Sequence, residues 1–138
     1  MKDFESIQPG DTAKLSHTVT AKDVETFAGL TGDDNPLHMD EQYAAKTRFK
    51  HRVVHGMLTA SFLSTIIGPL LPGRGALYLS QELNFKKPVF INDIIDARVT
   101  VIQKITVTRM LVLETTISNQ HAQVVITGKA KVMCPVND

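Results

Sequence analysis

An acidic side chain and an imidazole lie five residues apart at Asp33 and His38, within the segment DDNPLH. The residue before Pro36 is driven toward an extended conformation, so a helix cannot run through this segment. The resulting turn can direct Asp33 and His38 into one cleft. A carboxylate and an imidazole that share a water can move a proton in both directions near neutral pH. The structural alternative is that Asp33 or Asp34 caps the following helix and His38 is solvated on its first turn.

A second candidate is His55-Gly56-Met57, at the expected start of a helix. The first N–H groups of a helix lack intrahelical partners and lie at its positive end. A glycine there lets a ligand approach the backbone closely, and an N–H group can then stabilise a carbonyl oxygen that gains negative charge. The alternative is that Gly56 only relieves crowding where the chain enters the helix.

Residues 56–73 carry no charged side chain, and their large apolar residues fall on more than one side of a helical wheel. This predicts a buried helix with sheet around it, because the helical part is too short to span a membrane. Small residues recur every fourth position, at Gly56, Ala60, Ser64 and Gly68. The helix surface is shallow along these small residues. That side of the helix either packs tightly on the sheet or leaves space for a narrow, extended ligand.

Other chemically interesting residues are more simply explained. His51 and His55 have the spacing of two zinc ligands on a helix, but Arg52-Val53-Val54 between them favours extended structure, so no metal is expected. Basic residues at 50–52, 74 and 86–87 could meet phosphates, although exposed cations are usually just solvated. Cys134 is expected to be buried in the core.

The composition describes one ordinary globular domain. The chain has 138 residues, 43% of them hydrophobic and 21% charged, and its net charge of +1 argues against nucleic acid as a partner. The single cysteine cannot form an intrachain disulfide, and the first residues contain no apolar run typical of a secretory signal. We therefore expect a cytoplasmic protein without a membrane segment.

The periodicity predicts a helix-rich first half followed by strands. A capping box at Thr20 opens a helix that ends at Gly32, and a second short helix is expected from Leu37 to about Thr47. Four later segments alternate with period two, which indicates an antiparallel sheet with one apolar face; they begin near residues 77, 95, 111 and 124 and end near 85, 101, 117 and 132. The predicted fold is α+β, with a curved sheet wrapped around one hydrophobic helix.

Several of these segments together resemble a known family. GDDNPLHMD at 32–40, VHGML at 54–58, LPG at 71–73, LNF at 83–85 and KPV at 87–89 are similar to the hydratase motif of MaoC-like (R)-specific enoyl-CoA hydratases. The resemblance covers roughly residues 20 to 130. It implies a single hot-dog domain over residues 1–138 that forms a homodimer, uses no cofactor and binds an acyl-CoA thioester.

By this resemblance, Asp33 and His38 match the catalytic pair, and Gly56 matches the residue whose backbone N–H polarises the thioester. Asn35 matches an orienting group and Ser64 a residue near the catalytic aspartate. Ala60, Ser64 and Ile67 then become candidates for the wall of the acyl-chain site. The implied reaction is reversible addition of water to a trans-2-enoyl-CoA, giving an (R)-3-hydroxyacyl-CoA.

Two residues depart from the family pattern: Arg52 stands where proline is common, and Asn92 stands where glycine is common. Asparagine tolerates the left-handed conformation, so that turn is expected to be kept. A hot-dog thioesterase and a non-catalytic acyl-CoA binding module remain alternatives. Chain length, the choice between CoA and acyl-carrier-protein thioesters, and the pathway (storage polyester supply, fatty-acid oxidation or fatty-acid synthesis) are left open.

Overall fold

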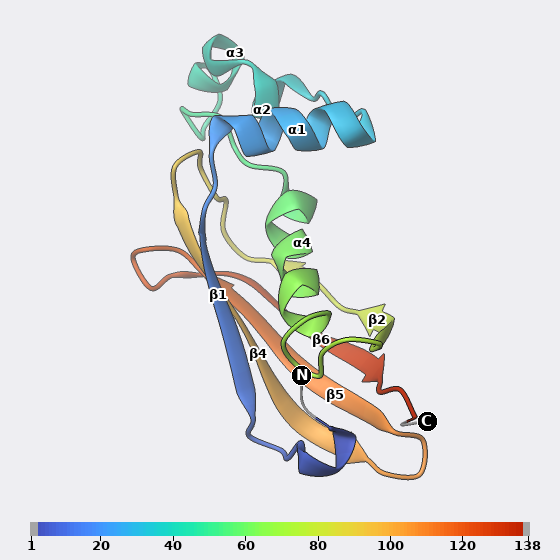
Figure 1. The fold of residues 1–138 in the computed structure, drawn as a ribbon. Coiled ribbons are helices and arrows are strands. Elements are labelled where there is room, and N and C mark those ends of the chain that lie inside the picture. Colours follow the sequence, from blue (N-terminus) through green and yellow to red (C-terminus); the bar gives the residue numbers. More distant parts are fainter. Residues whose placement is uncertain (1–2, 137–138) are drawn as a thin grey trace.

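A six-stranded antiparallel sheet forms most of the molecule, which we describe from a computed structural model for residues 3–136 (Figure 1). The sheet order is β1-β4-β5-β6-β2, and the short β3 also pairs with β6. The strands are β1 (Thr12–Thr18), β2 (Leu77–Gln81), β3 (Asn84–Phe85), β4 (Ile94–Ile105), β5 (Met110–Ser118) and β6 (Val124–Met133).

Helix α4 (Gly56–Ile67) lies against one face of the curved sheet, and the core fills the space between them (Figure 1). On β4 and β5 the predicted alternation is confirmed, because the apolar positions point to the helix and are buried while their neighbours are more exposed. This is the helix-in-sheet α+β arrangement predicted for the chain. The fully buried side chains include Leu63, Ile66, Val99, Leu111, Leu113 and Ile117.

The expectation that α4 is buried on every side is wrong for a single chain. Leu58, Leu63 and Ile66 face the sheet and are buried. Met57 is 59% exposed, and the polar side of the helix, which includes Ser64, is exposed as well. The sheet therefore covers only part of the helix.

The other helices gather at one end of the sheet (Figure 1). Helix α1 (Ala21–Thr31) has the predicted capping box between Thr20 and Asp23, and it ends at Gly32 with a φ of 82°. The single second helix expected from Leu37 is wrong: α2 (Pro36–Met39) and α3 (Glu41–Ala45) are separate. Asp40 breaks them because its extended backbone cannot continue a helix, and its carboxylate accepts hydrogen bonds from the first N–H groups of α3.

The long strand expected over residues 77–85 is also interrupted. A bulge falls between Tyr78 and Ser80, and the chain leaves the ladder before β3 begins. Gly128 on β6 permits this crossing, because a Cβ atom there would lie 1.8 Å from the carbonyl oxygen of Glu82. Asn92 adopts the predicted left-handed conformation, with a φ of 74°.

A short 3₁₀ helix, η1 (Phe4–Ser6), covers the far end of the core. The fold is a single domain, although the predicted limits at residues 1 and 138 lie outside the described residues. Within residues 3–136, no helix is long and apolar enough to cross a membrane.

Candidate active site

Asp33 follows directly on the end of α1. The left-handed Gly32 turns the chain, and the Asp33 N–H donates to Thr31 Oγ1 at 3.2 Å. Its Oδ1 accepts from the Asn35 N–H at 3.3 Å, which fixes the carboxylate in an Asx-type turn. The side chain remains exposed, so the carboxylate is held by local backbone but is open to solvent.

His38 lies on α2 and is oriented by a distant strand-like segment. Its Nδ1 is 2.6 Å from the carbonyl oxygen of Val53. A carbonyl oxygen only accepts, so Nδ1 carries the proton and donates it. In the neutral ring this leaves a lone pair on Nε2, which is the atom available to a substrate or a water.

His55, the N-cap residue of α4, joins these two parts. Its Nε2–H donates to the backbone oxygen of Asp33 at 2.9 Å, and only 2% of the residue is exposed. The ring lies 4.8 Å from Phe27 and 4.0 Å from His38, measured between centroids. Sequence reasoning gave His55 no place in the site beyond the helix entry, because its contact with Asp33 spans 22 residues.

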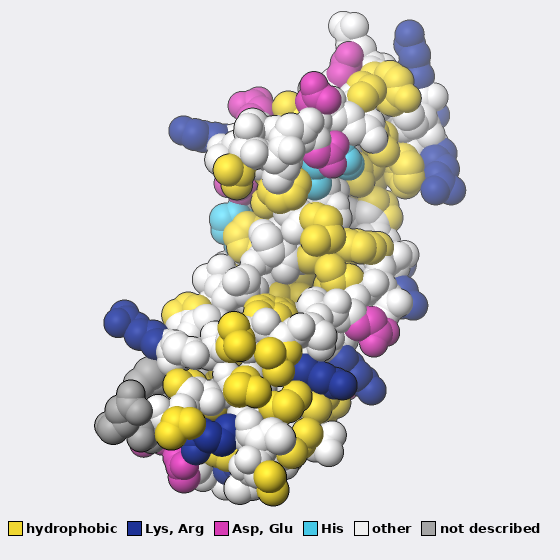
Figure 2. Space-filling model, turned by 90° about the vertical axis from the view of Figure 1, so that its right-hand side faces the viewer, with side chains coloured by type: hydrophobic (Ala, Val, Ile, Leu, Met, Phe, Trp, Pro, Cys, Tyr) yellow, Lys and Arg dark blue, Asp and Glu magenta, His cyan; other side chains and the backbone are white. Residues whose placement is uncertain are grey.

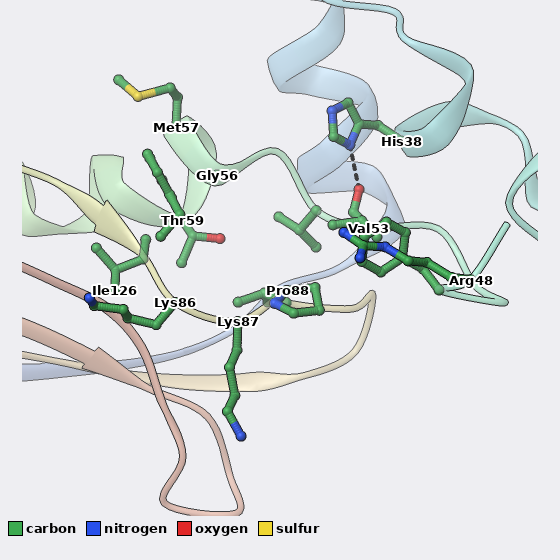
Figure 3. Close-up of a pocket in the computed structure, with 14 residues that line it drawn as sticks. His38, Arg48, Val53, Gly56, Met57, Thr59, Lys86, Lys87, Pro88 and Ile126 are labelled. Atoms are coloured by element: carbon green, nitrogen blue, oxygen red, sulfur yellow. Dashed lines mark hydrogen bonds between the residues drawn. The ribbon is translucent and has the colours of Figure 1, made fainter.

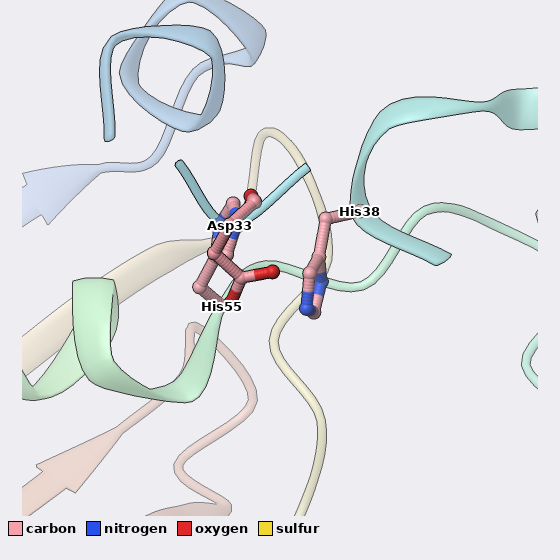
Figure 4. A group of neighbouring side chains, drawn as sticks. All are labelled: Asp33, His38 and His55. Carbon is pink, nitrogen blue, oxygen red and sulfur yellow. The ribbon is translucent and has the colours of Figure 1, made fainter. Parts of the chain in front are cut away.

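Asp33, His38 and His55 converge at the amino end of α4 (Figure 4). One carboxylate oxygen and one ring nitrogen from each histidine all lie within 4.8 Å of one another. No direct hydrogen bond joins the Asp33 carboxylate to His38 among the described contacts, so both groups keep free acceptor positions. Groups at such a separation are close enough to share one water molecule.

Gly56 is the first residue of α4, and its N–H makes no hydrogen bond within residues 3–136. It lies against the ring of Phe85, where an added Cβ would be 2.6 Å from Cε1. A larger residue at position 56 therefore has no space unless the ring moves. The backbone donor and the absence of a side chain are both as predicted for this position, while its use as an oxyanion donor stays a prediction.

Beside these groups is a cavity of about 520 Å³, which reaches from His38 past Gly56 (Figure 3). Its inner walls are apolar, and Arg48, Lys86 and Lys87 also line it. Thr59 contributes a hydroxyl that is buried without a partner among the described residues. The remaining lining residues are Phe49, Val53, Val54, Met57, Phe85, Pro88, Val89 and Ile126.

Four predicted substrate contacts are placed elsewhere in the single chain. The Asn35 side chain caps α2 by accepting from the Leu37 N–H at 3.1 Å, a task that had been considered for Asp33 or Asp34. Ala60 and Ile67 are buried in the core, and Ser64 is exposed on α4. None of the four lines the cavity, so their contact with substrate stays a prediction.

His51 and His55 do not share a helix, in agreement with the expectation that their spacing does not mark a zinc site. His51 lies outside any helix and its Nδ1 is 3.0 Å from Glu41 Oε1. The cluster of Asp33, His38 and His55 offers three ligand atoms within 4.8 Å of one another. A metal-free reaction remains our expectation.

Comparison with known proteins bears on the whole chain. The MaoC-like domain family matches residues 5–123. An (R)-specific enoyl-CoA hydratase of Rhodospirillum rubrum is 45% identical over 132 residues, which cover 96% of this chain and 91% of the relative. A 3-hydroxybutyryl-CoA dehydratase of Methylorubrum extorquens is 42% identical over 96% of this chain and 83% of its own length.

A solved structure agrees with these sequence relatives. The (R)-hydratase from A. caviae, described as involved in PHA biosynthesis, superposes with a TM-score of 0.93 at 42% identity, over 95% of this chain and 99% of that one. Sequence and fold thus agree along nearly the full length. The chain belongs to the MaoC-like domain family, as a hot-dog hydro-lyase of the (R)-specific enoyl-CoA hydratase type.

Proposed function

We propose that Asp33 and His38 together hold and activate the water that adds to a trans-2-enoyl thioester. The observation that carries this proposal is their convergence, within 4.8 Å, at the amino end of a helix whose first N–H is free. His38 contributes the lone pair of Nε2, because Nδ1 is committed to the Val53 carbonyl. Asp33 contributes a carboxylate that an Asx-type turn keeps in place.

In the reaction, one of the two groups takes a proton from the water as its oxygen forms a bond to Cβ. The electron pair of the double bond moves through Cα onto the thioester oxygen, and the Gly56 N–H stabilises the developing charge. A proton then returns to Cα on the same face, because both side chains lie on one side of the substrate. The product is an (R)-3-hydroxyacyl thioester, and the reverse sequence removes water.

The cavity supports a CoA thioester as the substrate. Its apolar walls suit an acyl chain and a pantetheine arm, while Arg48, Lys86 and Lys87 supply cations for phosphates. Of the basic residues singled out in the sequence, only Lys86 and Lys87 line this cavity, and Arg48 joins them. Such a cation cluster favours the phosphate-rich CoA over a bare pantetheine thioester.

We propose a homodimer formed along the β2 edge. Within residues 3–136, β2 and β3 pair only with β6, so their outer edge has no neighbouring strand, and unprotected edges favour association. Large apolar side chains are exposed beside this edge: Met57 at 59%, Leu77 at 59%, Leu79 at 43% and Phe85 at 53%. Figure 2 shows hydrophobic side chains gathered on this face of the molecule. A second copy would cover them and the open side of α4.

This dimer also bears on the proposed substrate contacts. Ser64 faces the uncovered side of α4, so an acyl chain beside it would be enclosed only by a second copy. Ala60 and Ile67 would border its deeper end from the core, while Asn35 would act by fixing α2. A cytoplasmic location is part of the same proposal and agrees with the free thiol of Cys134.

The deciding experiment follows the loss of ultraviolet absorbance of crotonyl-CoA and longer enoyl-CoA homologues, and then determines the configuration of the product. We expect loss of the conjugated double bond and an (R) product. An (S) product, or no loss at any chain length, contradicts the proposal. Release of free thiol without a hydroxyacyl product would instead indicate a thioesterase, and binding without turnover a non-catalytic module.

A further inference from the structure

The loop that leads into α4 makes an unusual contact through Arg52. Its Nε–H donates to the backbone carbonyl of His38 at 2.6 Å, and the contact is partly buried. Arg52 stands where proline is common in the family, and this contact ties it to the backbone of a proposed catalytic residue, 14 positions earlier.

The His38 carbonyl needs such a partner because of the break between α2 and α3. If α2 continued, the Gln42 N–H would donate to this oxygen four residues before it. That N–H donates instead to Asp40 Oδ1 at 2.9 Å, because Asp40 caps α3. The His38 carbonyl is thus one of the orphan acceptors at a helix end, and Arg52 satisfies it.

Three hydrogen bonds then join the same two short segments. The Val53 N–H donates to the Leu37 oxygen at 3.2 Å, the His38 ring donates to the Val53 oxygen at 2.6 Å, and Arg52 donates to the His38 oxygen. On its other side the loop is anchored to the segment between β3 and β4, since the Val54 N–H donates to the Val89 oxygen at 2.7 Å. Two adjacent loop residues therefore hold His38: Val53 binds its ring and Arg52 binds its backbone carbonyl.

We propose that Arg52 is a positioning residue for His38: its hydrogen bond to the His38 carbonyl holds α2 so that Nε2 stays directed at Asp33. This inference rests on the proposed function of His38. A hydrogen bond from a charged donor is stronger than a neutral one, and small displacements of a catalytic group lower the rate markedly. Arg52 does not line the cavity, so its effect is on turnover and not on substrate binding.

The test compares two uncharged side chains of similar length, only one of which keeps a hydrogen-bond donor. In Arg52→Gln the amide nitrogen occupies the same place along the side chain as Nε, so the donor is kept while the charge is lost. Arg52→Met removes the donor and keeps the length. With crotonyl-CoA we expect Arg52→Met to lower kcat about tenfold with KM changed less than about twofold, and Arg52→Gln to stay within about threefold of wild type.

Two further measurements separate positioning from general destabilisation. In a His38→Gln background, Arg52→Met should cause no additional loss, because the residue through which it acts is gone. Lys46→Met, which removes an exposed cation from the end of α3, should leave kcat unchanged. Equal losses from Arg52→Met in both backgrounds, or an Arg52→Gln variant as slow as Arg52→Met, would overturn the proposal.

An activity-independent readout keeps this inference separate from the proposed function. Nitrogen NMR of the histidine rings reports the Nδ1-protonated form of His38 directly. We expect Arg52→Met to shift the His38 ring signals and to leave those of His17 and His121 in place. Unchanged His38 signals overturn the positioning role, whether or not the wild-type protein hydrates crotonyl-CoA. If the signals shift but the wild-type protein does not hydrate crotonyl-CoA, the proposed reaction is contradicted and the positioning role is not.

Discussion

Two aspartate–histidine pairs lie at opposite ends of α1, and they differ in how completely their hydrogen bonds are satisfied. At the amino end, His17 Nε2 is 2.8 Å from Asp23 Oδ2, and the same oxygen accepts from the Thr20 N–H at 3.0 Å. The His17 ring also stacks on Phe62, with centroids 4.3 Å apart. His17 and Asp23 are therefore hydrogen-bonded to each other, and their contacts link β1, α1 and α4.

At the carboxyl end, Asp33 and His38 are each oriented by backbone groups and not by each other. The Asp33 carboxylate extends toward His38 (Figure 4). His55 contacts both residues, through a hydrogen bond to the Asp33 backbone oxygen and a ring contact with His38. The same residue types thus stabilise the fold where they bond to each other and become available for chemistry where the backbone orients them separately. The following predictions test this difference, from the largest expected effect to the smallest.

Replacing Asp33 with asparagine should have the largest effect. The amide keeps the shape of the carboxylate but cannot act as a base, and loss of a general base lowers rates by about 10²–10⁴-fold. The measurement is kcat for crotonyl-CoA hydration, with the melting temperature as a check on folding. The matched change Asp23→Asn should leave kcat nearly unaltered. Near-normal activity of Asp33→Asn would remove this residue from the mechanism.

Gly56→Ala should lower kcat by about 10–100-fold, because the oxyanion donor depends on the backbone position of this residue. The added methyl would lie 2.6 Å from the Phe85 ring, so either the ring or the helix start must shift. Combining Gly56→Ala with Phe85→Ala removes the obstacle and should recover part of the loss. If the single variant retains full activity, Gly56 is not needed for close approach to the substrate.

Replacing Lys86 and Lys87 together with glutamine should raise KM for crotonyl-CoA about tenfold while kcat stays constant. The expected reason is loss of charge-assisted contacts with phosphates, which bind the ground state and transition state equally. Crotonyl-pantetheine, which lacks the nucleotide phosphates, should show no such change. The control pair Lys129→Gln and Lys131→Gln removes two cations outside the cavity. An equal rise in KM with both substrates would show that Lys86 and Lys87 do not bind the phosphate groups of CoA.

Asp23→Asn should lower the free energy of unfolding at pH 7 by about 0.5–1 kcal/mol, because a neutral amide in the first turn of α1 loses the favourable interaction of the carboxylate with the positive helix end. Burial opposes ionisation of Asp23, but hydrogen bonds from Thr20 and His17 outweigh it, so the pKa of this carboxyl lies below its ordinary value. A lowered carboxyl pKa stabilises the fold above the unfolded-state value and loses that contribution as the pH falls through the folded-state pKa.

The difference in stability between wild type and Asp23→Asn should therefore shrink as the pH is lowered below the ordinary aspartate pKa of about 3.9. Urea unfolding at several pH values measures it, with hydration activity at pH 7 as the companion readout. A large loss of activity without a loss of stability would show that this pair, too, takes part in the reaction.

Much of this arrangement could be predicted from local sequence. The capping box at Thr20, the stop at Gly32, the left-handed Asn92 and the alternation along β4 and β5 each depend on neighbouring residues, and the structure contains these features. The motif residues Asp33, His38 and Gly56 were also singled out from their spacing. The interruption of the second helix at Asp40 was not predicted, because the residues around it favour helix. Asp40 instead acts as the N-cap of a new helix, α3.

Only the tertiary structure decided how the candidate residues meet. His55 reaches Asp33 across 22 residues, His38 reaches Val53 across 15 and Arg52 reaches His38 across 14, and no local pattern encodes such contacts. The exposed side of α4 likewise could not be predicted from the sequence. Its small and apolar residues suit either a core or a surface that a second chain covers. Sequence determined which groups were available and which elements carried them. Packing determined which of their atoms were left free to react. A side-chain atom that is hydrogen-bonded to the backbone is not available to a substrate, so the backbone contacts of each residue decide which atoms remain.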